Sequence, residues 1–215
     1  MCEKIIADKD PNYDLIAGFK DEDLTDEQML DILAEEIEKI QSDAMYEGLR
    51  LDRIYASFET HVTAGFATHT LRKMKEYAES DSFPGGVYSP RTDTIVINEK
   101  VLCNPALRTL DLRKTIVHEA IHRKMFTEGY GEEPPHGERF QAWCVRYGIN
   151  YIEAVQGDRN QAIVHPLQMP KVMRDFGIAV TEPAWEALSS AAYIECDIEI
   201  DDLLRRSDWV EEYQL

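Results

Sequence analysis

The chain has 215 residues, enough for one domain with a sizeable core, and its four cysteines stand too far apart for a disulfide framework or a zinc ribbon. It carries 23 lysines and arginines against 41 aspartates and glutamates, a formal net charge of −18 that argues against a nucleic-acid partner. No apolar run approaches the roughly 20 residues of a membrane helix, and the first residues do not resemble a signal peptide. We therefore expect a cytoplasmic protein with no membrane partner.

The first helix is predicted to begin at Thr25, after an irregular acidic leader over residues 1–24. Thr25 and Gln28 have the spacing of a capping box, in which each side chain accepts a hydrogen bond from the backbone N–H of the other residue. Apolar residues then recur at helical spacing, at Met29, Ile32, Leu33, Ile37 and Ile40. We expect this amphipathic helix to continue to about Gly48.

Residues 51–77 also favour one or two helices, with an apolar face that includes Ile54 and Phe58. Two histidines, His61 and His69, lie in this stretch. We interpret them as surface or partly buried side chains rather than as ligands of a site.

The best hairpin signal in the chain spans residues 87–98. Val87 and Tyr88 begin it, residues 89–93 form a turn, and residues 94–98 are rich in β-branched side chains. An exposed edge of such a hairpin can hold an extended peptide by main-chain hydrogen bonds. A purely structural hairpin explains the same residues equally well.

The stretch Thr115–Phe126 places two histidines, His118 and His122, four residues apart, with Glu119 directly after the first. Four residues are about one helical turn, so both imidazoles would leave the same face of a helix. Two imidazoles on one face can bind Zn²⁺, and a carboxylate beside them can reach a water at the metal. A buried apolar stripe supports the helix, at Ile116, Val117, Ala120 and Ile121.

A third ligand is expected beyond a glycine- and proline-rich loop at residues 127–135. His136 is the first candidate, at the start of a second predicted helix, and Glu138 is the next. Glu132 and Glu133 are further alternatives. An apolar face would pack this helix against the first, through Phe140, Trp143, Cys144 and Tyr147.

The last third of the chain, residues 149–215, has no pattern that indicates chemistry. Pro166 and Pro170 predict a loop, and Thr181 precedes a helix start with an early proline. Residues 201–210 favour one more short helix. We expect this region to complete the core or to form an accessory surface.

Together these motifs resemble the SprT-like zinc metallopeptidase domain, which is related to the Spartan proteases that degrade proteins crosslinked to DNA. The resemblance rests on His118-Glu119-Ala120-Ile121-His122, a 13-residue loop, and then His136-Gly137 with Phe140, all preceded by a hairpin that ends at residues 95–98. It covers roughly residues 24–148. Many members of the family also carry a downstream module of four cysteines, and the DNA-directed members have a basic DNA-binding surface. This acidic sequence shows neither pattern.

The resemblance implies an α+β, zincin-like fold with a small antiparallel sheet or hairpin beside the helix of the two histidines. It implies one Zn²⁺ per chain, bound by His118, His122 and His136, with Glu119 as the catalytic base. The chain would then divide into the leader, a peptidase domain and a mostly helical extension, at residues 1–24, 25–148 and 149–215.

The expected function is that of a zinc metalloendopeptidase, which hydrolyses peptide bonds in a protein or peptide substrate with a metal-activated water. Tyr130, Tyr88 and Arg139 are candidates to stabilise the oxyanion, and the sequence does not choose among them. The family resemblance allows DNA-associated substrates, whereas the net charge argues against them. The alternative is a catalytically silent zinc-binding interaction module of the same fold.

Overall fold

The computed structural model describes residues 21–58, 85–155 and 161–196. They belong to two compact units. The first unit comprises Met1–Ile40 and Arg53–Ile116, and the second comprises Gln41–Asp52 and Val117–Leu215. The boundary between them falls inside helix α6 (Pro105–Thr127), so one continuous helix contributes to both. The predicted division at residues 24 and 148 stays a prediction.

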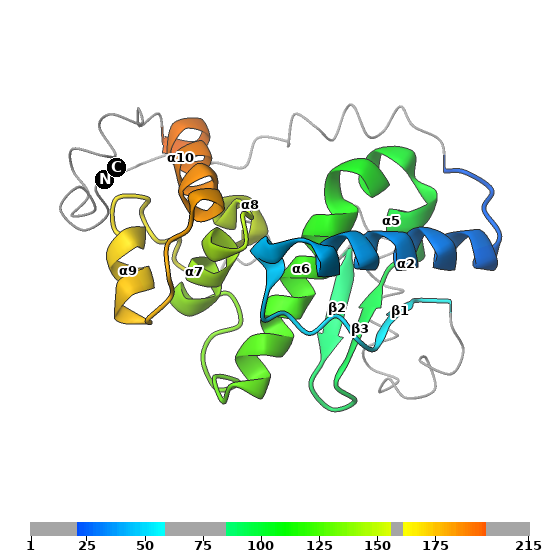
Figure 1. The fold of residues 1–215 in the computed structure, drawn as a ribbon, viewed down its shortest axis with the longest axis horizontal. Helices are drawn as coiled ribbons and strands as arrows, with labels where there is room; N and C mark the ends of the chain where they lie inside the picture. The colour runs from blue at the N-terminus through cyan, green and yellow to red at the C-terminus, as the bar shows by residue number, and fades with distance from the viewer. Residues whose placement is uncertain (1–20, 59–84, 156–160, 197–215) are drawn as a thin grey trace. The chain divides into compact units, whose positions relative to one another are not determined.

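The first unit contains a three-stranded sheet in the order β1-β3-β2 (Figure 1). Its strands are β1 (Ile54–Ala56), β2 (Gly86–Ser89) and β3 (Thr94–Ile97). The predicted hairpin is confirmed, because β2 and β3 pair antiparallel. The sheet as a whole is mixed, since β1 pairs parallel to β3, and all four residues of the central strand β3 are buried.

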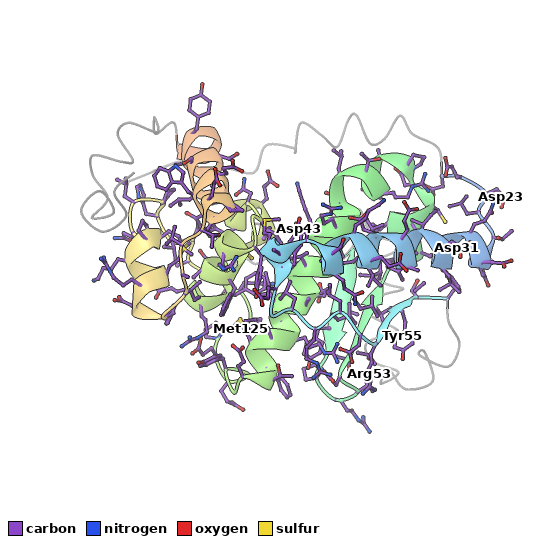
Figure 2. The ribbon with its side chains drawn as sticks, viewed as in Figure 1. Asp23, Asp31, Asp43, Arg53, Tyr55 and Met125 are labelled. Atoms are coloured by element: carbon purple, nitrogen blue, oxygen red, sulfur yellow. The ribbon has the colours of Figure 1, made fainter. Side chains whose placement is uncertain are left out.

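Strand β1 corrects the helix predicted from residue 51 onward. Ile54–Ala56 is extended because its neighbours bond to β3: the N–H of Ile95 donates to the carbonyl of Arg53 at 3.1 Å, and the N–H of Ser57 to that of Ile97 at 2.9 Å. Arg53 and Tyr55 are labelled in Figure 2 at this edge of the sheet. A three-residue strand is too short to show its own period. Residues 59–77, with His61 and His69, lie outside the described part of the chain.

Helix α2 (Asp26–Ser42) begins where the capping box predicted. The N–H of Thr25 donates to Oε1 of Gln28 at 2.9 Å, and the N–H of Gln28 donates to Oγ1 of Thr25 at 3.3 Å. The helix ends at Ser42 rather than near Gly48, because Asp43 caps the short 3-10 helix η1 (Ala44–Tyr46) through a hydrogen bond from the N–H of Met45.

Two asparagines determine where the helices after the sheet begin. Asn98 caps α5 (Glu99–Cys103) by accepting from the N–H of Lys100 at 3.2 Å. Asn104 caps α6 by accepting from the next turn, and Pro105 occupies the first helical position, where its missing N–H leaves no bond unmade. Helix α6 therefore begins well before the stretch Thr115–Phe126 that carries the two histidines.

The second unit is helical in its described residues. After the second half of α6 come α7 (Glu138–Arg146), α8 (Tyr151–Val155), α9 (Met169–Asp175) and α10 (Glu182–Cys196). Helix α7 packs against α8, α9 and α10 (Figure 1). The helix start after Thr181 is confirmed as α10. The loop predicted at Pro170 is wrong, because this proline lies in the first turn of α9, where a helix tolerates it.

Within the described residues, no helix is both long and apolar enough to span a bilayer. The short helix predicted for residues 201–210 lies outside the residues that the structure describes.

Candidate metal centre

Helix α6 carries the two histidines that are four residues apart. The apolar stripe that predicted the helix is fully buried, at Ile116, Val117, Ala120 and Ile121. His118 and His122 leave the same face, and their Nε2 atoms are 3.1 Å apart. The regular hydrogen bonds of the helix therefore determine the relative position of these two side chains.

A glycine ends α6 and lets the chain return toward the histidines. Gly129 has a φ of 92°, which side-chain-bearing residues rarely adopt. The N–H of Tyr130 then donates to the carbonyl of Met125 at 2.8 Å, the capping bond of a helix that ends in a left-handed residue. The loop that follows leads to His136.

His136 lies just outside α7 rather than at its start, because Gly137 is the N-cap of the helix. The chain turns tightly here, with the N–H of Gly137 donating to the carbonyl of Pro134 at 2.9 Å. A Cβ atom at Gly137 would lie 3.1 Å from that carbonyl oxygen, closer than ordinary packing allows. The glycine after His136 is thus explained by close approach of the backbone.

The structure brings His118, His122 and His136 together as predicted. Their ligand nitrogens all lie within 4.8 Å of one another, and the three side chains are partly exposed. The alternative third ligands do not join this cluster. Glu132 and Glu138 are exposed, and Glu133 forms an ion pair with Arg139 at 3.0 Å.

The surroundings of His118 and His122 favour neutral imidazoles. Burial lowers the pKa of His118 to about 3, and repulsion from His136 adds to the effect. Burial also lowers the pKa of His122 well below its ordinary value, with His118 and His136 contributing repulsion. A neutral imidazole keeps a lone pair available for a metal, so His118 and His122 have the protonation state that a ligand needs.

The donor set fits a zinc ion. Nitrogens that share one tetrahedral Zn²⁺ at about 2.0–2.1 Å lie roughly 3.4 Å from one another. The His118–His122 separation of 3.1 Å is already close to this value. The widest separation, at most 4.8 Å, needs to close by about 1.4 Å at most, a distance within reach of a ring rotation.

Phe140 is the residue whose part in the site the sequence did not reveal. It was predicted as a packing residue and as part of the family motif, without a role beside the histidines, and it is fully buried. Its ring centroid lies 4.8 Å from that of His118, 4.4 Å from that of His122 and 5.0 Å from that of His136. The ring therefore packs against all three imidazoles. Its position three residues after Gly137 was the only available signal.

Glu119 is buried on α6, with only 7% of its surface exposed. Carboxylates are seldom buried this far without a partner or a function, and this one directly follows a candidate ligand.

Of the three residues considered for oxyanion support, Arg139 bonds to Glu133, and the hydroxyl of Tyr88 donates to Asp93 at 3.3 Å.

Arg123, which directly follows His122, was also missed. Its side chain is completely buried, and its guanidinium donates to the carbonyls of Arg50 and Asp52 and to Oδ1 of Asp52 at 3.1 Å. Burial pushes the pKa of Asp52 upward, but the hydrogen bond from Arg50 and the charge of Arg123 outweigh it, so the pKa lies below its ordinary value. Arg123 therefore fixes residues 50–52 against α6.

Comparison with known families gives one match. The SprT-like family matches residues 44–160, more than half of the chain and a range that includes all three histidines, Glu119 and Phe140. No curated protein matches the chain, and no solved structure does.

Proposed function

Because the chain belongs to the SprT-like family, we propose that it is a zinc-dependent metalloendopeptidase that hydrolyses peptide bonds in protein substrates. The observation that carries the proposal is the cluster of His118, His122 and His136, which follows the ligand order of the family and has Glu119 next to its first member. A zincin-like arrangement of the fold is part of the same proposal.

In this proposal the three histidines bind one Zn²⁺ per chain. All three ligands are neutral, so the ion would keep its full charge. When bound in such a site, zinc lowers the pKa of a water toward about 7 and polarises a carbonyl. The chain's contribution is to hold the three imidazoles in place, with Phe140 packed against each of them.

Glu119 is the proposed general base. A buried carboxylate beside the ligands can take a proton from the attacking water and deliver it to the leaving amine. Its position directly after His118 is the feature that separates a catalytic site from a purely structural zinc site, which needs no carboxylate there.

The proposal is tested by comparing the parent protein with Glu119→Gln. The substitution keeps size and hydrogen-bonding capacity but removes the base, so zinc content and melting temperature should stay near those of the parent. Cleavage of an unfolded protein substrate, and self-cleavage, should fall by about 10²–10⁴. Equal cleavage by both proteins would refute the role of Glu119. If both proteins bind zinc and neither cleaves the substrate, the result would favour the catalytically silent binding module.

We also propose that the substrate is reached without binding DNA directly. With a net charge of −18, affinity for duplex or single-stranded DNA at physiological salt should be no tighter than the weak non-specific range of about 10⁻⁴ M. Fluorescence anisotropy across a salt series measures this. Micromolar binding with a steep salt dependence would overturn the proposal and favour DNA-associated substrates.

A further inference from the structure

The backbone of His136 is held by a side chain from α7. Gln141 is completely buried, and its Nε2 donates to the carbonyl of His136 at 3.0 Å. The same nitrogen donates to the carbonyl of Ala162 at 2.9 Å, and Oε1 accepts from the N–H of Val164 at 2.8 Å. One amide therefore joins His136 to a segment more than twenty residues further along the chain.

That segment is itself fixed from a second direction. The hydroxyl of Tyr151 on α8, a completely buried residue, donates to the carbonyl of Val164 at 2.6 Å. Val164 thus has its N–H bonded to Gln141 and its carbonyl bonded to Tyr151. Buried backbone groups bonded on both sides resist displacement, because each lost bond would leave a polar group unsatisfied.

A second connection reaches the loop that carries His136. The guanidinium of Arg139 lies 3.7 Å from the ring centroid of Tyr130 and 4.2 Å from that of Phe176. It also forms an ion pair with Glu133 at 3.0 Å. Tyr130 and Glu133 belong to the loop before His136, whereas Phe176 is the C-cap of α9. A cation between two rings and a carboxylate joins these parts firmly.

We propose that residues 161–178 position the third metal ligand, with Gln141 and Phe176 as the positioning residues that connect this segment to His136. The family match ends at residue 160, so the segment lies beyond the part of the chain that the family defines. The inference rests on the proposed metal centre. The inference concerns His136 alone because this residue lies outside a helix. The backbone hydrogen bonds of α6 already orient His118 and His122.

Zinc affinity separates positioning from stability. Measured well below the melting temperature of the metal-free protein, where nearly every molecule is folded, the affinity reports the geometry of the ligands and not the free energy of unfolding. Substitution of a residue that hydrogen-bonds a metal ligand typically lowers metal affinity by about 10–100-fold. The absorption spectrum of the cobalt-loaded protein gives a second, independent report on ligand geometry.

The main variant is Gln141→Met in the full chain, which keeps the volume of the side chain but removes its hydrogen bonds. We expect zinc affinity, by chelator competition, to fall by about 10–100-fold and the cobalt spectrum to change. Phe176→Ala should lower zinc affinity by roughly threefold to tenfold. Phe176→Trp keeps a ring against Arg139, so its zinc affinity should be that of the parent. Arg123→Lys is the matched control, a substitution at another buried polar side chain of the same unit that bonds residues 50–52 instead.

The control should lower the melting temperature and leave zinc affinity at the parent value. Parent affinity and an unchanged cobalt spectrum in Gln141→Met would overturn the inference. If Gln141→Met does not fold, equal zinc affinities for Phe176→Ala and Phe176→Trp would overturn it instead. A parent protein that binds no zinc would refute the metal centre itself, a result distinct from zinc binding that the variants leave unchanged.

Discussion

The two halves of the candidate metal centre are built in different ways. His118 and His122 stand on α6, where backbone hydrogen bonds repeat with a fixed pitch. His136 stands in a loop before α7, and its backbone is held by Gln141, which is itself bonded to the distant residues Ala162 and Val164. The positions of two candidate ligands therefore follow from local structure, whereas the position of the third depends on tertiary packing.

Removal of a ligand from either half gives the largest expected effect. His122→Ala and His136→Ala should each lower zinc affinity by more than about 100-fold, because each removes one of the three proposed bonds to the ion. Loss of a residue that only supports a ligand typically costs up to about 100-fold. Zinc content by atomic emission, with chelator competition, measures both. If His136→Ala binds zinc as tightly as the parent and Glu138→Ala does not, the third ligand is Glu138 and not His136.

A substitution at Arg123, on the helix that carries His118 and His122, should change the stability of the protein and not its zinc affinity. Arg123→Lys keeps the charge of this buried side chain but loses the forked geometry, so the carbonyls of Arg50 and Asp52 lose donors. We expect the free energy of unfolding to fall by about 1–3 kcal/mol in urea titrations. Zinc affinity of the folded protein should not change, since the α6 ladder still orients His118 and His122. A parallel loss of affinity would erase the contrast between the halves.

Phe140 contacts both halves, so its substitution should have a smaller and more even effect. Phe140→Leu keeps an apolar side chain but loses the flat surface against the three rings. We expect a loss of about 1 kcal/mol in stability. A severalfold decrease in zinc affinity should accompany it. Calorimetric titration measures the affinity, and an effect confined to stability would limit Phe140 to a packing role.

The smallest expected effect is the pH dependence of the Arg123–Asp52 contact. The pKa of Asp52 lies below its ordinary value in the folded protein, so its contribution to stability is present above the unfolded value of about 3.9. That contribution is lost as the pH falls through the folded pKa. Urea midpoints between about pH 5 and pH 2.5 should therefore fall more in the parent than in Asp52→Asn, whereas parallel curves would contradict the assignment.

Several features were correctly read from the sequence because neighbouring residues determine them. The capping box at Thr25, the hairpin of β2 and β3, and the helical face of His118 and His122 each depend on contacts within a few residues. His136 was found from its motif, and the structure places it beside the other two histidines. The roles of these residues in binding zinc, and of Glu119 in catalysis, stay predictions.

Distant contacts determined the rest. The period of residues 51–77 suggested helix, yet Ile54–Ala56 is a strand because β3 supplies its hydrogen bonds. Nothing in the sequence distinguishes Gln141 from an ordinary polar helix residue, or Phe176 from an ordinary loop aromatic. The sequence by itself determined which side chains could bind a metal, since helical pitch and residue chemistry are local. Only the tertiary structure decided what holds the third of them, because the partners of Gln141 and Arg139 are brought together by packing of the second unit.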